Sequence, residues 1–205
     1  MSGHVTTGFY GKLPARGDFV RAGLPRDFTD PWDDWLQAVI AGSQSLMGED
    51  WLPAFLEAPV WRFTLPRGMC GAQAVLGLML PSVDRTGRYF PLTFAALSPY
   101  GIAKAAGEAW LDACEAAGRA ALEQDTPPQV VAGLVGVPEL PAAAAGVADA
   151  VWWSEGSARV TPTCLALRCL PDAAIYAAML GAETKGTDVA SDASGHGERK
   201  RESPS

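Results

Sequence analysis

Residues 72–97 have the sequence AQAVLGLMLPSVDRTGRYFPLTFAAL, in which two apolar runs flank a charged turn. The first run, 72–80, is nearly all apolar, which is typical of a strand buried on both faces of a sheet. The second run, 90–97, follows after a connection too short for a parallel crossover, so the two runs predict antiparallel neighbours. The turn between them carries Asp84, Arg85 and Arg88, more charge than a chain reversal needs. This excess makes the turn the first candidate for a functional site.

Further strands are predicted on both sides of this pair. Residues 60–65, VWRFTL, alternate in polarity and would complete a three-stranded antiparallel meander with the two apolar runs. Shorter strands are expected at 8–13, 150–153 and 161–167, the last two joined by a turn of Ser, Glu and Gly.

Three helices are predicted between and after these strands. Asp30-Pro31 is a helix-start signal, and apolar residues then recur at helical spacing until Gly42. The longest helical pattern, 102–124, carries a stripe of small residues and ends before Pro127-Pro128. A last helix opens at Pro171-Asp172. Residues 130–137 fit a strand or a helix equally well, and the stretch 125–148 as a whole is not placed.

The order of these elements predicts an α/β fold. We expect a single-domain layered sandwich, a mixed and mostly antiparallel sheet of five to six strands with flanking helices, over residues 1–180. Residues 181–205 contain almost no large apolar side chain, and we expect them to form a disordered tail.

The charge of the chain limits its partners. A net charge of −7 argues against nucleic acid and against anionic membranes, because both are bound by basic surfaces. The N-terminus lacks the charged and apolar segments of a signal peptide, and the longest apolar run is too short for membrane insertion. We therefore expect a cytoplasmic protein.

Histidine and cysteine give no catalytic or metal site. The two histidines, His4 and His196, lie near the ends of the chain, where a catalytic triad or a metal centre would not be held by the fold. The four cysteines show no CxxC spacing, and we interpret them as reduced core residues. There is no phosphate-binding loop and no dinucleotide motif. The sequence predicts no catalytic residue, no metal and no cofactor.

Two groups of arginine and carboxylate remain as candidates. Arg16 lies near Asp18, and Asp84 lies near Arg85 and Arg88. An arginine fork can bind a phosphate or a carboxylate. The alternative is structural: Asp84 accepts backbone N–H groups inside the turn, and Arg88 pairs with a loop acid such as Asp18. The two interpretations can hold together, because a rigid turn is also a good recognition surface.

The tryptophans divide into two groups. Four of them fall on apolar faces and are interpreted as core: Trp32, Trp35, Trp61 and Trp110. Trp152 and Trp153 are neighbours on one strand and must face opposite sides. We expect one of the two to be exposed at an edge or under a partner, since tryptophan often dominates protein interfaces.

These residues resemble a known family. The segments GFYGKLP (8–14), GDFV (17–20) and WDDWLQ (32–37) are similar to the N-terminal signature of the TagF family, whose members are associated with type VI secretion. The segments PSVDR (81–85) and GRYFPL (87–92) resemble its second signature. Trp152-Trp153 and LPD (170–172) resemble its C-terminal part, so the resemblance covers roughly residues 8–180.

The resemblance implies a cytoplasmic α/β domain that represses type VI secretion after translation. In that family the regulation involves a forkhead-associated scaffold protein and a threonine phosphorylation pathway. Some members are fused to a PppA-type phosphatase, and for this chain we expect any such phosphatase to be a separate protein.

Three functional hypotheses follow. The first is a non-catalytic regulatory binding domain that is not an enzyme and that binds a component of the secretion apparatus or its scaffold. Its expected surface contains Arg16, Asp18, Asp84, Arg85, Arg88, Trp152 and Trp153. The second is an enzyme or phosphoryl-ligand binder that uses Asp18, Asp84 and Arg88. The third is a structural accessory subunit of the secretion machine.

Overall fold

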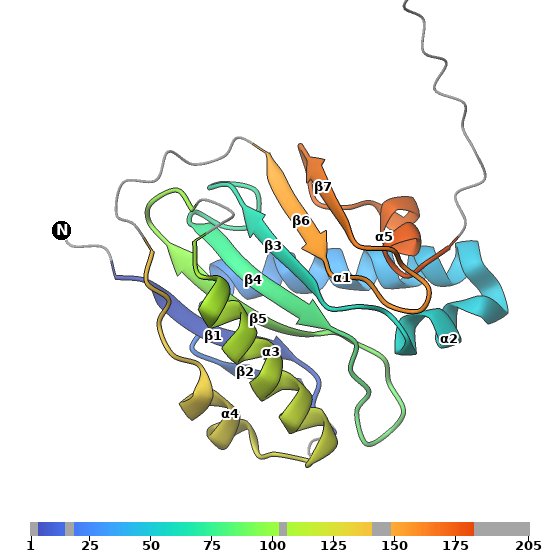
Figure 1. Ribbon diagram of the computed structural model, residues 1–205, viewed down its shortest axis with the longest axis horizontal. Helices are drawn as coiled ribbons and strands as arrows, with labels where there is room; N and C mark the ends of the chain where they lie inside the picture. The colour runs from blue at the N-terminus through green and yellow to red at the C-terminus, as the bar shows by residue number, and fades with distance from the viewer. Residues whose placement is uncertain (1–3, 15–18, 103–105, 141–148, 183–205) are drawn as a thin grey trace, which may run out of the picture.

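The fold is a seven-stranded sheet with helices on both faces (Figure 1). The computed structural model describes residues 4–14, 19–102, 106–140 and 149–182. The strand order is β2-β1-β5-β4-β3-β6-β7, and every pairing is antiparallel. The strands are β1 (Thr6–Gly11), β2 (Val20–Ala22), β3 (Trp61–Leu65), β4 (Ala74–Leu80), β5 (Leu92–Ser98), β6 (Ala150–Ser154) and β7 (Thr163–Leu167).

The predicted α/β sandwich is confirmed, with one strand more than expected. The additional strand is β2, which lies in a stretch where the sequence predicts a loop. Its three residues pair with β1 from Phe9 to Gly11. So short a strand carries too little alternation to be recognised from sequence.

The two apolar runs form the middle of the sheet. Every residue of β4 and of β5 is buried, which explains why neither strand alternates in polarity. They pair over their whole length, from Ala74 with Ser98 to Leu80 with Leu92. The stretch that decides the fold therefore supplies its central antiparallel pair, as predicted.

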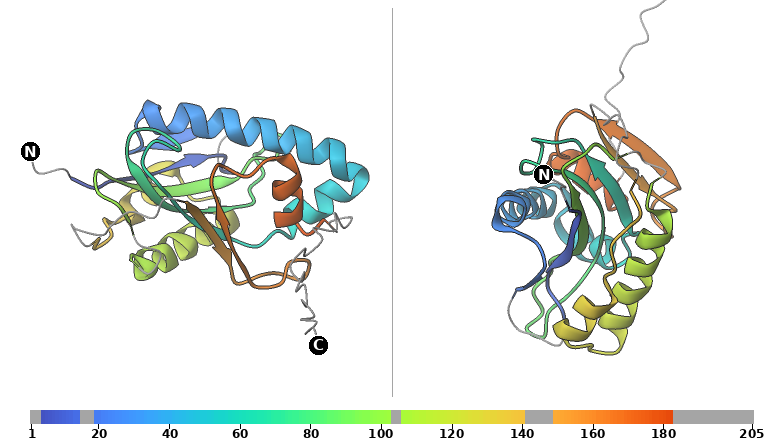
Figure 2. Two further views of the ribbon diagram at one scale, coloured as in Figure 1. Left: turned by 90° about the horizontal axis from the view of Figure 1, so that it is seen from above. Right: turned by 90° about the vertical axis from the view of Figure 1, so that its left-hand side faces the viewer.

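Helices cover both faces of the sheet (Figure 2). One face carries α1 (Arg26–Met47), α2 (Trp51–Leu56) and α5 (Ala173–Met179), with the short 3-10 helix η1 (Gly48–Asp50) between the first two. The other face carries α3 (Glu108–Glu123) and α4 (Pro128–Leu134). The helix α4 resolves the ambiguity at 130–137, while 141–148 and the tail from 183 onward lie outside the described residues.

The first helix is longer than predicted at both ends. It begins at Arg26, so Asp30-Pro31 is not its start. Pro31 lies inside the helix, near its beginning, and leaves the Asp27 carbonyl without its usual intrahelical donor. Gly42 does not end the helix either. A Cβ atom on Gly42 would lie 2.5 Å from the Cβ of Ala173, so this glycine lets α5 approach α1 closely.

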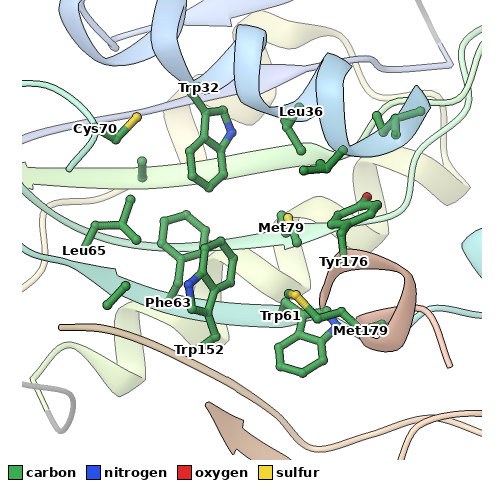
Figure 3. Close-up of a cluster of buried hydrophobic side chains, with 14 of the residues drawn as sticks. Trp32, Leu36, Trp61, Phe63, Leu65, Cys70, Met79, Trp152, Tyr176 and Met179 are labelled. Atoms are coloured by element: carbon green, nitrogen blue, oxygen red, sulfur yellow. Dashed lines mark hydrogen bonds between the residues drawn. The ribbon is translucent and has the colours of Figure 1, made fainter. Parts of the chain in front are cut away.

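Aromatic side chains fill the layer between the sheet and α1 (Figure 3). The ring of Phe63 lies 4.9 Å from that of Trp32 and 4.8 Å from that of Trp152, measured between centroids. The indole N–H of Trp32 donates to the Thr93 hydroxyl at 3.0 Å. The indole N–H of Trp61 donates to the Met179 carbonyl at 3.0 Å, which fixes α5 to β3.

The cysteine prediction is right for two residues and wrong for two. Cys70 and Cys114 are buried, and burial raises the pKa of each thiol to about 12. Cys164 and Cys169 are exposed instead, because β7 is an edge strand and the turn after it faces solvent. None of the four forms a disulfide.

Candidate functional site

The charged turn between β4 and β5 is a small hairpin of its own. Val83 and Tyr89 form an isolated antiparallel bridge across it. The Asp84 N–H donates to the Arg88 carbonyl at 3.0 Å, and the Phe90 N–H donates to the Ser82 carbonyl at 3.0 Å. Gly87 has a φ of 80°, a conformation that favours glycine. The turn is therefore a defined structure that projects beyond the end of the sheet (Figure 1).

The buried carboxylate of Asp84 organises this turn. Its Oδ1 accepts the Thr86 N–H at 2.8 Å, the Thr86 hydroxyl at 2.7 Å and the Arg88 N–H at 3.0 Å. Its Oδ2 accepts Arg88 Nε at 2.7 Å and Lys12 Nζ at 2.6 Å. The prediction that Asp84 accepts backbone N–H groups within the turn is thus confirmed.

Lys12 is the residue that sequence reasoning missed. It follows β1 directly, and only 3% of it is exposed. Its ammonium forms a buried ion pair with Asp84, and its backbone carbonyl accepts the Ser82 hydroxyl at 2.7 Å. The pair joins the turn to the end of β1, 72 residues earlier in the chain. A lysine inside the apolar segment GFYGKLP was the available signal, because a buried cation needs a buried partner.

The hydrogen bonds to Asp84 determine its ionisation. Burial alone would raise the pKa of this carboxyl. The hydrogen bonds from Lys12, the Arg88 backbone, Thr86 and the Arg88 side chain outweigh that effect and hold the pKa of Asp84 well below its usual range. The group is therefore a carboxylate at physiological pH.

One aromatic ring covers the buried lysine, and two further rings pack against that ring. The Lys12 ammonium lies 4.4 Å from the centre of the Phe19 ring. Phe19 stacks on Tyr10 at 5.7 Å and meets Phe90 edge-on at 4.7 Å. Because 43% of Phe19 is exposed, this ring forms an apolar patch close to the turn.

Two arginines of the turn reach solvent. The Arg85 side chain is 71% exposed, and its nearest acid, Asp125, lies at 3.9 Å. The Arg88 side chain is 54% exposed while its Nε contacts Asp84. Arg88 therefore pairs with an acid of its own turn, while the predicted pairing of Arg88 with Asp18 lies outside the described residues. Arg16 and Asp18, which were predicted to join this surface, lie outside the described residues.

The prediction of an exposed tryptophan at 152–153 is wrong. Trp152 is fully buried, and Trp153 is only 6% exposed. The two do face opposite sides of β6, as expected, and they belong to the cores on the two sides of the sheet. Both are covered because β6 is an inner strand, between β3 and β7. They are core residues and not part of the surface at the turn.

The Asp84 carboxylate is fully engaged by donors of the protein itself. Both oxygens of Asp84 already accept hydrogen bonds, so this carboxylate has little capacity left to act as a base.

Within the described residues, no group of three or more histidine, cysteine or acidic side chains could hold a metal ion. No helix in the described part of the chain is both long and apolar enough to span a membrane.

A fully antiparallel α/β sandwich with a charged turn fixed by a buried lysine defines the class of this protein. The profile of the TagF N-terminal domain, described as type VI secretion system-associated, matches residues 8–135. The chain therefore belongs to the TagF N-terminal domain family.

Comparison with solved structures agrees with this membership. The chain is similar to PA0076 of Pseudomonas aeruginosa PAO1, known from a crystal structure, with 32% sequence identity and a TM-score of 0.77. The alignment covers 88% of this chain and 96% of PA0076. No curated protein matches the sequence.

Proposed function

We propose that this domain is a cytoplasmic, non-catalytic regulator that represses type VI secretion after translation. It does so by binding the forkhead-associated scaffold of the apparatus, and a PppA-type phosphatase pathway acts through separate proteins. Membership of a family associated with type VI secretion supports the process. The exposed arginines on a turn held by Lys12 and Asp84 are the observation that carries the binding role.

The rigidity of the turn supports recognition. A surface that is already ordered loses little conformational entropy on binding. Arg85 is exposed and its contact with the exposed Asp125 is long, at 3.9 Å, so its guanidinium can form a bidentate pair with a carboxylate or a phosphate of the partner. Phe19, which packs over Lys12 and against Phe90, adds an exposed apolar contact close to the turn.

The two rival hypotheses differ from the proposal in what they require. An enzyme centred on Asp84 would need an oxygen free to take a proton from a substrate, and both oxygens are occupied by donors of the protein. A structural subunit would copurify in fixed stoichiometry with the assembled machine, whereas a repressor would not.

Overproduction of the protein in a bacterium with an active type VI system tests the proposal. We expect the wild-type chain to stop release of a secreted marker protein, and Arg85→Glu to restore release, because the reversed charge repels the partner's acid. Secretion is measured as the amount of marker in the culture medium.

Arg26→Glu is the matched control, because Arg26 is exposed but lies at the start of α1. It should repress as the wild type does. Equal repression by all three chains at equal expression would show that the turn is not the functional surface. Failure of the wild type to repress would reject the repressor role itself.

A further inference from the structure

In the part of the chain that the structure describes, no strand pairs with the outer edge of β7. It is the last strand in the order, and it pairs only with β6 among the described residues (Figure 1). Its sequence, TCLAL, contains no charge and no proline. Proteins usually protect such edges with charges, prolines or bulges, because unpaired N–H and C=O groups accept a further strand.

An apolar groove runs beside this open edge. It lies between β7 and α5 and has a volume of about 690 Å³. Small side chains on α5 keep it open, with Ala174 exposed and Ala178 half-buried. Its principal lining residues are Leu165 and Leu167 of β7 and Ala174, Ile175 and Ala178 of α5.

Two arginines lie at the end of β7. A second hollow, formed by the turn after β3 and the residues after β7, is lined by Arg67 and Arg168. Neither arginine has an acidic partner among the described residues. The Nε of Arg67 donates only to the Ala72 carbonyl, at 3.3 Å. This end of the open edge is therefore positively charged and not neutralised.

We propose that β7 binds an extended segment of a partner protein as an eighth strand. The segment places alternate apolar side chains in the groove and an acidic side chain near Arg67 and Arg168. Pairing along a sheet edge supplies main-chain hydrogen bonds, while pockets for alternate side chains supply specificity. This surface involves other residues than the charged turn, so the proposal stands apart from the proposed function.

Two other occupants fit less well. The chain's own residues 183–205 carry a single large apolar side chain, Val189, and cannot fill the groove with an alternating pattern. A second copy paired antiparallel through β7 would bring Arg168 near residues 160–162 of the other copy. Those residues are Val, Thr and Pro and offer no carboxylate.

Selection from a phage-displayed library of random linear peptides, with the full chain as bait, tests this inference. We expect enriched peptides to combine alternating apolar residues with an acidic residue at one end. A synthetic peptide of the enriched sequence should slow amide hydrogen exchange in β7. Its affinity should fall about tenfold or more in Ala174→Trp, which fills the groove, and in Arg168→Glu.

Two controls separate the surface from general effects. Ala113→Trp changes an exposed alanine on α3, and Arg26→Glu changes an exposed arginine on α1. Both should bind the peptide as the wild type does. The proposal is overturned if no peptide of this pattern is enriched, or if the peptide binds Ala174→Trp and Arg168→Glu unchanged. A dimer joined through β7 in sedimentation would overturn it as well. Should Ala174→Trp fail to fold, Arg168→Glu decides the outcome.

Discussion

The pairing of Lys12 with Asp84 is the energetic centre of the charged turn. Both side chains are almost fully buried. Removing both charges from water is costly, and their contact compensates only while both partners are present. The four further donors to Asp84, two from Thr86 and two from Arg88, complete the compensation. This explains how so many charged groups can stand between two strands that are entirely buried.

A double-mutant cycle measures this dependence. We expect Lys12→Met and Asp84→Asn each to lower the free energy of unfolding by about 3–5 kcal/mol, because each leaves the other charge buried without its partner. The double variant should lose less than the sum of the two, with a coupling of about 1–3 kcal/mol. Urea denaturation measures all four chains. Additive losses would mean that the two groups do not depend on each other.

The low pKa of Asp84 predicts a loss of stability in acid. In the unfolded chain this carboxyl takes up its proton near pH 4, as an ordinary aspartate does (about 3.9). In the folded protein it stays ionised to lower pH, because its pKa is depressed. The contribution of Asp84 to folding stability is therefore complete above about pH 4 and is lost as the pH falls from there towards the folded-state pKa.

Comparison with Asp84→Asn isolates this effect. The stability advantage of the wild type over Asp84→Asn should be largest near neutral pH and should shrink below about pH 4. Denaturant unfolding at a series of pH values measures it. An advantage that stays constant as the pH falls would show that Asp84 is not held as a carboxylate.

Close packing of α1 against α5 gives a prediction at the scale of elements. Gly42→Leu should lower the free energy of unfolding by about 1–3 kcal/mol, because its side chain would collide with Ala173. Ala41→Leu, at the exposed neighbouring position, should change stability by no more than about 0.5 kcal/mol. Thermal unfolding compares the two variants. Equal stability would mean that α5 can move away from α1 without cost.

The helix α3 is held against the sheet by ion pairs. Arg62 on β3 donates to Glu108, Asp112 and Glu115, which follow one face of α3, at 2.9, 2.7 and 3.1 Å. Burial by itself lowers the pKa of this guanidinium, but the hydrogen bonds and charges of Asp112 and Glu115 outweigh burial and raise the pKa. A single arginine on the sheet thus forms ion pairs with three acids and fixes the helix over β3.

The sequence predicted elements where a local pattern was strong. The long apolar runs of β4 and β5 could form only buried strands, and the Asp172 signal correctly marks α5, where its side chain accepts the Ile175 N–H at 2.8 Å. The ends of helices that depend on packing between residues far apart in the chain were not predicted correctly. The sequence predicts a helix end at Gly42, although the role of this glycine is set by a residue 131 positions later, Ala173.

The candidate site was predictable only in part for the same reason. The hydrogen bonds of Asp84 within its own turn are local and were expected from the spacing. Lys12 was missed because its partner is distant in the chain. The exposed tryptophan was predicted from alternation alone, which says that Trp152 and Trp153 face opposite ways but not that helices and neighbouring strands cover both faces.

At the scale of the whole molecule, two surfaces are available for partners. The charged turn with Arg85 and Phe19 lies where β4 leads into β5, and the open edge lies at β7. The family places the domain in type VI secretion. The turn is the surface that the proposed regulation uses.

Direct binding to the purified forkhead-associated scaffold tests this central claim most closely. Titration calorimetry with the wild type should show binding. The affinity of Arg85→Glu should be lower by a factor of about ten or more, since a reversed charge at the contact is repulsive. Arg26→Glu should bind as the wild type does. Equal affinity of all three chains, or no binding by the wild type, would contradict the account.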